Sequence, residues 1–262
     1  MEAVRACVIT GYGINADEEL VEAFRLAGAR AERRHVNELL ERPEEIDAYR
    51  ILAFPGGFSF GDHLGSGLVF AGLCRGRLKE ALERFIDAGN LVIGICNGFQ
   101  VLVKLGILPN LSGSWEQEVS LVHNDSGLFE NRWVRVRFQA DSPCVWTRGL
   151  EEMELPVRHG EGRFVAASDR VLEEVERRRL VALRYAPRFG STVVAYPDNP
   201  NGSVHDIAGV CDPSGRVFGL MPHPEAFIVP QNHPRWTREH VAEGFGLRIF
   251  RNAVMHVGES AT

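Results

Sequence analysis

The chain has 262 residues, of which 45% are hydrophobic, and a formal net charge of −6 at pH 7. This length and apolar content are enough to bury a sizeable core, as one large α/β domain or two small ones. The negative charge argues against nucleic-acid and anionic-membrane partners, because both require a basic surface. The basic run at 176–179 lies in an acidic segment and is interpreted as a solvated helix face.

The N-terminal residues show no basic stretch followed by a long apolar segment, and no run of about 18 apolar residues occurs. We therefore expect a cytoplasmic protein without a membrane partner. The cysteines are odd in number and form no C-x-x-C pair, which predicts reduced thiols and neither a disulfide framework nor a metal site. They are Cys7, Cys74, Cys96, Cys144 and Cys211.

The first 106 residues alternate between apolar runs and amphipathic segments. Strands are predicted at 3–9, 49–57 and 90–96, and helices at 15–28, 76–89 and 97–106. Asn15 or Asp17 is the expected cap of the first helix, and Gly28 its end. Repeated β-α units of this kind predict a parallel sheet with helices on both faces.

After about residue 115 the pattern changes to short alternating segments separated by Gly, Pro and Asn. Strands are predicted at 132–139, 153–159, 180–186, 191–197 and 216–222, with a final helix at about 237–255. They indicate an antiparallel or mixed extension of the same sheet. Because no repeat, low-complexity tract or linker interrupts the chain, we expect one domain over 1–262. The predicted fold is a three-layer α/β arrangement around a mostly parallel sheet.

Cys96 lies between Gly94 and Gly98, where a predicted strand runs into a predicted helix. A strand, G-x-C-x-G and a helix match the nucleophile elbow, a tight turn that presents a reactive side chain. The glycines leave room for the turn, and the helix N-terminus favours a thiolate. The alternative is a cysteine that only packs the end of a buried strand.

A base for such a thiol is offered by His223, which stands between two prolines at the end of a predicted strand. The prolines restrict the backbone, so the imidazole is presented rigidly. Glu225 is two residues further on and can orient the second ring nitrogen, as the third member of a triad does. The predicted constellation is therefore Cys96, His223 and Glu225.

Acyl transfer at the thiol would also require donors to the developing oxyanion. The backbone N–H of Asn97 is one candidate, and that of Gly57, in the turn at 54–62, is another. An ordinary β-α turn is the alternative for 54–62. This turn lacks the lysine of a nucleotide P-loop.

Five motifs in this order carry a resemblance to a known family: "PGGFSFGD", "GICNGFQ", "HGEGRF", "NPNGSVHDIAGV" and "GLMPHPE". The chain closely resembles the glutaminase subunits of phosphoribosylformylglycinamidine synthase, which are class I glutamine amidotransferases with a flavodoxin-like fold. The resemblance spans nearly the whole chain. It implies hydrolysis of L-glutamine to glutamate and ammonia, with Cys96 as nucleophile, His223 as proton shuttle and Glu225 as its orienting partner.

The resemblance also suggests residues that hold the substrate. Gln100 would help to bind glutamine, although an amide that caps nearby backbone is the alternative. His159, Gly160 and Glu161 would line the glutamine pocket through their backbone. Many members of the family have an arginine after His-Pro-Glu, where this chain has Ala226.

The resemblance places the synthetase chemistry on another polypeptide, since no ATP-binding motif is recognisable in this sequence. The expected partners are a PurL-type synthetase subunit, which would use ATP and Mg²⁺, and a small PurS-type bridging subunit. This chain is expected to hold no cofactor. Segments 61–67 and 230–240 are candidate docking elements, with Arg235 and Trp236 as anchors; a tryptophan that anchors its own C-terminal helix is the alternative.

The chain is longer than short members of the family, with the excess at about 165–190 and 226–245 and no role assigned to either. Two rival classes remain. A cysteine elbow also occurs in DJ-1/PfpI-like proteins. These usually place a histidine immediately after the cysteine or elsewhere, whereas in this chain Asn97 follows Cys96. The second rival is a scaffold subunit that has lost activity.

Overall fold

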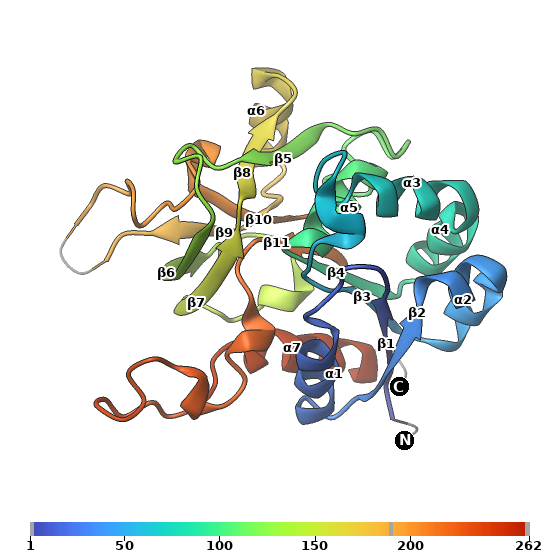
Figure 1. Cartoon of the computed structure of the whole chain (residues 1–262), viewed down its shortest axis with the longest axis horizontal. Helices are drawn as coiled ribbons and strands as arrows, with labels where there is room; N and C mark the ends of the chain where they lie inside the picture. The colour runs from blue at the N-terminus through green and yellow to red at the C-terminus, as the bar shows by residue number, and fades with distance from the viewer. Residues whose placement is uncertain (1–2, 189–190, 260–262) are drawn as a thin grey trace.

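The computed structural model describes residues 3–188 and 191–259, which form one large sheet, one small sheet and the helices around them (Figure 1). The large sheet has nine strands, in the spatial order β2 (Arg30–His35), β1 (Arg5–Thr10), β3 (Ile51–Phe54), β4 (Leu91–Ile95), β11 (Val217–Leu220), β10 (Ile207–Cys211), β9 (Val181–Ala186), β6 (Glu130–Phe138) and β7 (Glu152–His159). The small sheet pairs β5 (Val119–His123) with β8 (Glu161–Ala166).

The large sheet has a parallel half and an antiparallel half. Strands β2, β1, β3, β4 and β11 pair in parallel, and β11, β10, β9, β6 and β7 pair antiparallel. The parallel half has the flavodoxin-like order, with a reversal of strand order between β1 and β3. The α/β class and the mixed extension are thus confirmed. The antiparallel half has the predicted number of strands, but β10 takes the place of the strand that was predicted at 191–197.

Helices cover both faces of the parallel half, as the alternating pattern predicted (Figure 1). On one face α1 (Asp17–Leu26) and α7 (Leu247–Glu259) contact each other, with the rings of Phe24 and Phe250 5.1 Å apart. On the other face lie α3 (Leu68–Arg77) and α5 (Asn97–Leu105). The remaining helices are α2 (Val36–Glu41), α4 (Lys79–Asp87) and α6 (Asp169–Arg177).

The central strands lie between these two layers and are apolar for that reason. Every residue of β3 and β4 is buried, as is expected of parallel strands covered on both faces. The edge strand β2 is charged instead, with the sequence RAERRH and one fully covered residue, Ala31. The most buried strands of the sheet are therefore those whose ends hold the predicted site residues.

Three local predictions were wrong. The first helix is capped by Ala16, and neither Asn15 nor Asp17 serves as the cap. Asp17 is buried and accepts hydrogen bonds from the side chains of Thr10, at 2.7 Å, and Arg33, at 3.2 Å. Gly28 does end the helical turn, with a φ of 96°.

The segment 191–197 forms no strand, although it alternates like one. The Ser191 hydroxyl bonds both backbone groups of Val193, which closes a local turn in place of a ladder. The last helix begins at Leu247, ten residues later than predicted. Before it, Gly246 packs so closely that a Cβ would lie 2.1 Å from the Pro224 carbonyl oxygen, so this segment follows the loop after His223.

Candidate active site

The carboxyl ends of β1, β3, β4 and β11 meet at one edge of the parallel sheet, where ligands bind in open α/β folds. A cavity of about 360 Å³ opens there. Its walls come from the start of α1, the turn after β3, the end of β4 and the antiparallel half of the sheet. The lining residues are Asn15, Ala16, Glu19, Gly57, Phe58, Cys96, Phe129, Asn131, Arg158 and His223.

Cys96 stands in the turn between β4 and α5, with φ 52° and ψ −106°. Such a conformation is strained for a residue other than glycine, and the neighbouring glycines make it possible. A Cβ on Gly94 would lie 2.6 Å from the Gly98 carbonyl oxygen, and one on Gly98 would lie 1.8 Å from that of Phe54. The Cys96 N–H donates to Leu220 of β11 at 2.8 Å. The thiol is thus presented by an elbow that the packing of three strands holds in place.

His223 follows β11 and is almost fully buried, as is Glu225. Its Nδ1–H donates to Glu225 Oε1 at 2.6 Å, and its backbone N–H donates to the Pro156 carbonyl at 2.8 Å. The other ring nitrogen, Nε2, has no hydrogen-bond partner among the described residues. Glu225 therefore fixes the ring so that Nε2 remains available for chemistry.

Electrostatics around His223 favour its protonated form. Burial alone would lower the pKa of this histidine, but the negative charges of Glu225 and Cys96 outweigh burial and raise the pKa to about 10. The two reactive side chains pack against one glycine: a Cβ on Gly56 would lie 2.8 Å from His223 Cε1 and 3.6 Å from Cys96 Cβ. The thiol and the imidazole therefore share one buried site.

The turn after β3 is pinned to the loop after β1. Phe58 donates its N–H to the Gly13 carbonyl at 2.8 Å, and Asn15 donates to that of Gly56 at 3.3 Å. Gly57 between them has a φ of 152°, and a Cβ there would lie 2.6 Å from the Gly13 carbonyl oxygen. Within the described residues, the N–H groups of Gly57 and Asn97 donate to no protein acceptor. Both predicted oxyanion donors are thus unpaired in the protein.

The Asn97 side chain connects this turn to the nucleophile helix, a role that sequence reasoning missed. Asn97 is fully buried. Its Oδ1 accepts from the Ser59 N–H at 3.2 Å, while its Nδ2 donates to Asp62 Oδ1 at 3.3 Å and to Gln100 Oε1 at 3.0 Å. One amide therefore sets the distance between the two segments that carry the candidate oxyanion donors.

Comparison with known proteins agrees with this geometry. The model of the CobB/CobQ-like glutamine amidotransferase domain matches residues 3–257. A PurQ subunit of phosphoribosylformylglycinamidine synthase from Dehalococcoides mccartyi is 45% identical, over 97% of this chain and 98% of its own. The chain belongs to the PurQ family.

Two further relatives belong to a complex and to a longer protein. The solved structure of PurLQS from Thermotoga maritima contains a chain 31% identical to this one, with a TM-score of 0.71, over 98% of this chain and 100% of that one. The phosphoribosylformylglycinamidine synthase of Dictyostelium discoideum is 31% identical over 96% of this chain, which spans 20% of that longer protein.

Four residues that the family resemblance suggested as substrate contacts, Gln100, His159, Gly160 and Glu161, do not line the cavity. Gln100 is buried and donates to the Glu161 carbonyl at 2.5 Å, so its amide is used within the protein. His159 donates from Nδ1 to Asn124 Oδ1 at 3.1 Å, and burial lowers its pKa to about 3. The Gly160 carbonyl accepts from the Asn124 N–H at 2.9 Å. These residues support the wall of the site from behind.

The side chain that does reach the cavity from this segment is that of Arg158, and its carbonyl lies 3.6 Å from Cys96 Sγ. Successive residues of a strand point to opposite faces, so Arg158 faces the cavity and His159 the interior. Glu19 reaches the same cavity from α1. Neither residue was predicted. In the sequence, Glu19 looks like an ordinary acidic residue of a first helical turn, and Arg158 looks like an exposed residue of a strand.

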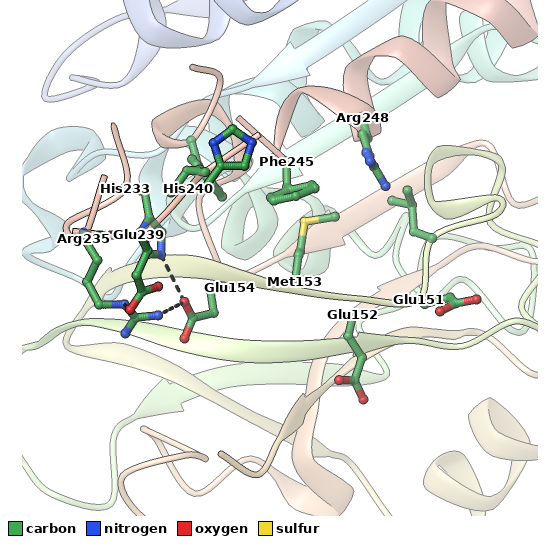
Figure 2. A pocket seen from close by; sticks show the side chains of 13 residues that line it. Glu151, Glu152, Met153, Glu154, His233, Arg235, Glu239, His240, Phe245 and Arg248 are labelled. Carbon is green, nitrogen blue, oxygen red and sulfur yellow. Dashed lines mark hydrogen bonds and ion pairs between the residues drawn. The ribbon is translucent and has the colours of Figure 1, made fainter. Parts of the chain in front are cut away.

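The segment 226–245, which contains the candidate docking element 230–240, borders a second cavity. This cavity of about 260 Å³ lies between β7 and residues 227–248 (Figure 2). His233 Nε2 and Arg235 Nη2 both donate to Glu154 Oε2, at 3.0 and 2.9 Å. Arg235, a predicted docking anchor, is thus bound within its own chain, whereas Trp236 is half exposed.

Residues 165–188 of the other longer segment contain the end of β8, then α6 and β9; residues 189–190 lie outside the described residues. The arginines of the basic run pair with acids, Arg177 and Arg178 with Glu174 and Arg179 with Asp141, as a solvated helix face predicts. Across the described residues, no helix is long and apolar enough to cross a membrane, and no cluster of three or more His, Cys, Asp or Glu side chains could hold a metal ion.

Proposed function

We propose that this chain hydrolyses L-glutamine to glutamate and ammonia at Cys96, as the glutaminase subunit of phosphoribosylformylglycinamidine synthase. The observation that carries the proposal is the buried elbow thiol beside an imidazole whose Nε2 is unpaired and whose Nδ1 is held by Glu225 at 2.6 Å. A cysteine, a base and an orienting carboxylate are the three groups that acyl transfer to a thiol requires.

In the first half of the reaction the proton of Cys96 resides on Nε2 of His223, as the raised pKa of this histidine favours, and the thiolate sulfur attacks the side-chain carboxamide carbon of glutamine. The oxygen of the tetrahedral intermediate takes up negative charge and accepts hydrogen bonds from the N–H groups of Gly57 and Asn97. His223 then returns the proton to the nitrogen as the C–N bond breaks. Ammonia leaves, and a thioester on Cys96 remains.

In the second half His223 removes a proton from water, whose oxygen attacks the thioester carbon. The C–S bond breaks, glutamate leaves, and the thiolate is restored beside the imidazolium. Glu225 keeps Nδ1 protonated in both halves, so Nε2 can accept and return a proton at each step.

The ammonia is proposed to reach an acceptor on a PurL-type synthetase, with a small PurS-type subunit as a bridge. Free ammonia is mostly protonated at neutral pH, so direct transfer within a complex preserves the nucleophile. The Thermotoga maritima PurLQS structure and the single long Dictyostelium discoideum synthase support such an assembly. ATP and Mg²⁺ would then be bound by the synthetase, and no cofactor by this chain.

The test is glutamate release from L-glutamine by the purified chain, with and without a PurL-type partner, ATP and acceptor, beside a Cys96→Ser variant. We expect release that the variant lacks, in one or both conditions. Glutamate release that is absent in both conditions, or equal in the variant, would overturn the proposal and favour a scaffold subunit.

A further inference from the structure

The outer wall of the active-site cavity carries one carboxylate and one guanidinium that face each other. Glu19 comes from α1 and Arg158 from β7, and both line the cavity that contains Cys96. Their side chains are 46% and 43% exposed, whereas Cys96 is only 5% exposed. The pair therefore stands at the mouth of the cavity, and the thiol at its floor.

The two charges are not satisfied by each other. The nearest approach of Arg158 Nη1 to Glu19 Oε2 is 4.0 Å, beyond hydrogen-bond distance. Among the described residues neither side chain makes a hydrogen bond, which contrasts with the Arg33, Arg34 and Arg235 pairs elsewhere on the surface. Beyond this long ion pair, the guanidinium donors and the carboxylate oxygens at the cavity make no hydrogen bond to the described residues.

The surroundings favour a cation at Glu19. Burial raises the pKa of Glu19, the negative charge of Glu225 raises it further, and Arg158 and His223 compensate only in part. An ammonium group placed beside Glu19 would relieve the repulsion between the two carboxylates. A carboxylate beside Arg158 would find the fork of donors that suits bidentate binding.

We propose that Glu19 and Arg158 recognise the α-ammonium and the α-carboxylate of the substrate. The proposal rests on the proposed function, in which the substrate is L-glutamine. Glutamine carries both charges at the end opposite its carboxamide, so a carboxamide at Cys96 directs the charged end toward the mouth. The rings of Phe58 and Phe129, 6.1 Å apart, also line the cavity and offer an apolar surface to the methylene groups between. The pair then selects α-amino acids over other amides.

Two glutamine analogues separate the roles of the two residues. Glutaramate lacks only the α-ammonium, and 4-aminobutanamide lacks only the α-carboxylate. The experiment measures equilibrium binding of both analogues and of L-glutamine by calorimetry in the Cys96→Ser chain, with and without the PurL-type partner. Glu19→Gln and Arg158→Gln are added singly to this background. Binding is read without turnover, so the result does not depend on the hydrolysis assay.

Glu19→Gln is expected to weaken the binding of L-glutamine and 4-aminobutanamide by about tenfold or more, and to leave the affinity for glutaramate within about twofold of the parent. Arg158→Gln is expected to weaken the binding of L-glutamine and glutaramate and to leave the binding of 4-aminobutanamide unchanged. Glu22→Gln on α1 and Arg137→Gln on β6 are matched controls that remove the same charges away from the cavity.

Equal effects of each variant on all three ligands would overturn the proposal, as would no effect or no binding of L-glutamine by the parent chain. If the native chain hydrolyses glutamine while any of these three results holds, the recognition pair is wrong and the proposed function stands. If the selective pattern appears without hydrolysis by the native chain, the recognition pair stands and the proposed function is wrong.

Discussion

Nδ1 of His223 lies 2.6 Å from Oε1 of Glu225, only two residues along the chain, and both side chains are almost fully buried. Replacement of Glu225 by Gln keeps the shape but removes the charge that holds the imidazolium. We expect a fall in kcat of about 10²-fold or more, because the ring loses its fixed tautomer. Steady-state glutaminase kinetics test this, and a variant within threefold of the parent would contradict it.

The same pair predicts how stability depends on pH. The pKa of His223 is raised to about 10 in the folded protein, above the value of about 6.5 for an unfolded chain, so the folded state binds more protons between these values. Stability from this group is complete below about pH 6.5 and is lost as the pH rises toward 10, by at most about 1.4 kcal/mol per pH unit.

Unfolding midpoints measured from pH 6 to 9.5 check this pH dependence. The parent is expected to lose stability across the interval more steeply than Glu225→Gln, because this variant lacks the carboxylate charge that raises the pKa of His223. Parallel curves for the two proteins would show that the pair does not titrate as described.

Packing predicts opposite effects on stability for Gly98 in the elbow and Gly72 in α3. Gly98→Ala forces a Cβ to within 1.8 Å of the Phe54 carbonyl oxygen, so we expect destabilisation of about 3 kcal/mol or more. Gly72→Ala in α3 meets nothing within 4 Å and should stabilise by up to about 1 kcal/mol. Chemical denaturation measures both, and similar free energies of unfolding for the two variants would refute the account.

Asn97 provides a test of how the oxyanion turn is positioned. Asn97→Ala removes the acceptor for the Ser59 N–H and the donor to Asp62, so the turn is free to move away from the elbow. We expect kcat to fall by about 10²-fold with a smaller change in KM. The alkylation rate of Cys96 by iodoacetamide should stay within about twofold, because this reaction forms no oxyanion. A parallel loss of alkylation would indicate general damage to the site.

Contacts of His233 beside the second cavity predict that its replacement loosens residues 228–246 but leaves glutamine hydrolysis unchanged. His233 contacts the rings of Trp133 and Phe227, at 5.0 and 5.5 Å, and donates to Glu154. His233→Ala should therefore increase amide hydrogen exchange in residues 228–246 at least severalfold. Glutamine hydrolysis should remain near that of the parent. Unchanged exchange would show that His233 does not hold this segment.

Sequence reasoning succeeded where the signal is local. The apolar runs of β1, β3 and β4 identify buried strands, and the glycines around Cys96 identify the elbow. Strand β2 was missed because its run of charges looks like a solvated segment, although Tyr49 and Arg5 bond its Glu32 from neighbouring segments. Strand pairing of this kind depends on contacts that the local pattern does not contain.

The candidate site shows the same division. Cys96, His223 and Glu225 stand in motifs whose spacing points to chemistry, whereas Glu19 and Arg158 acquire meaning only when α1 and β7 reach the same cavity. Gln100 shows the reverse case, since the family resemblance suggested that its side chain would help to bind glutamine. The buried amide of Asn97 takes that side chain instead.

The pairing of β4 with β11 has a consequence for synthesis on the ribosome. Gly94 lies beside Gly219, so the nucleophile strand keeps an open, apolar edge until the last quarter of the chain has emerged. The base, His223, arrives three residues after the end of that same late strand. A nascent or prematurely released chain therefore holds the thiol without its histidine and cannot discharge ammonia, but it exposes a strand edge prone to aggregation. The thiol and its histidine therefore come together only when translation is nearly complete.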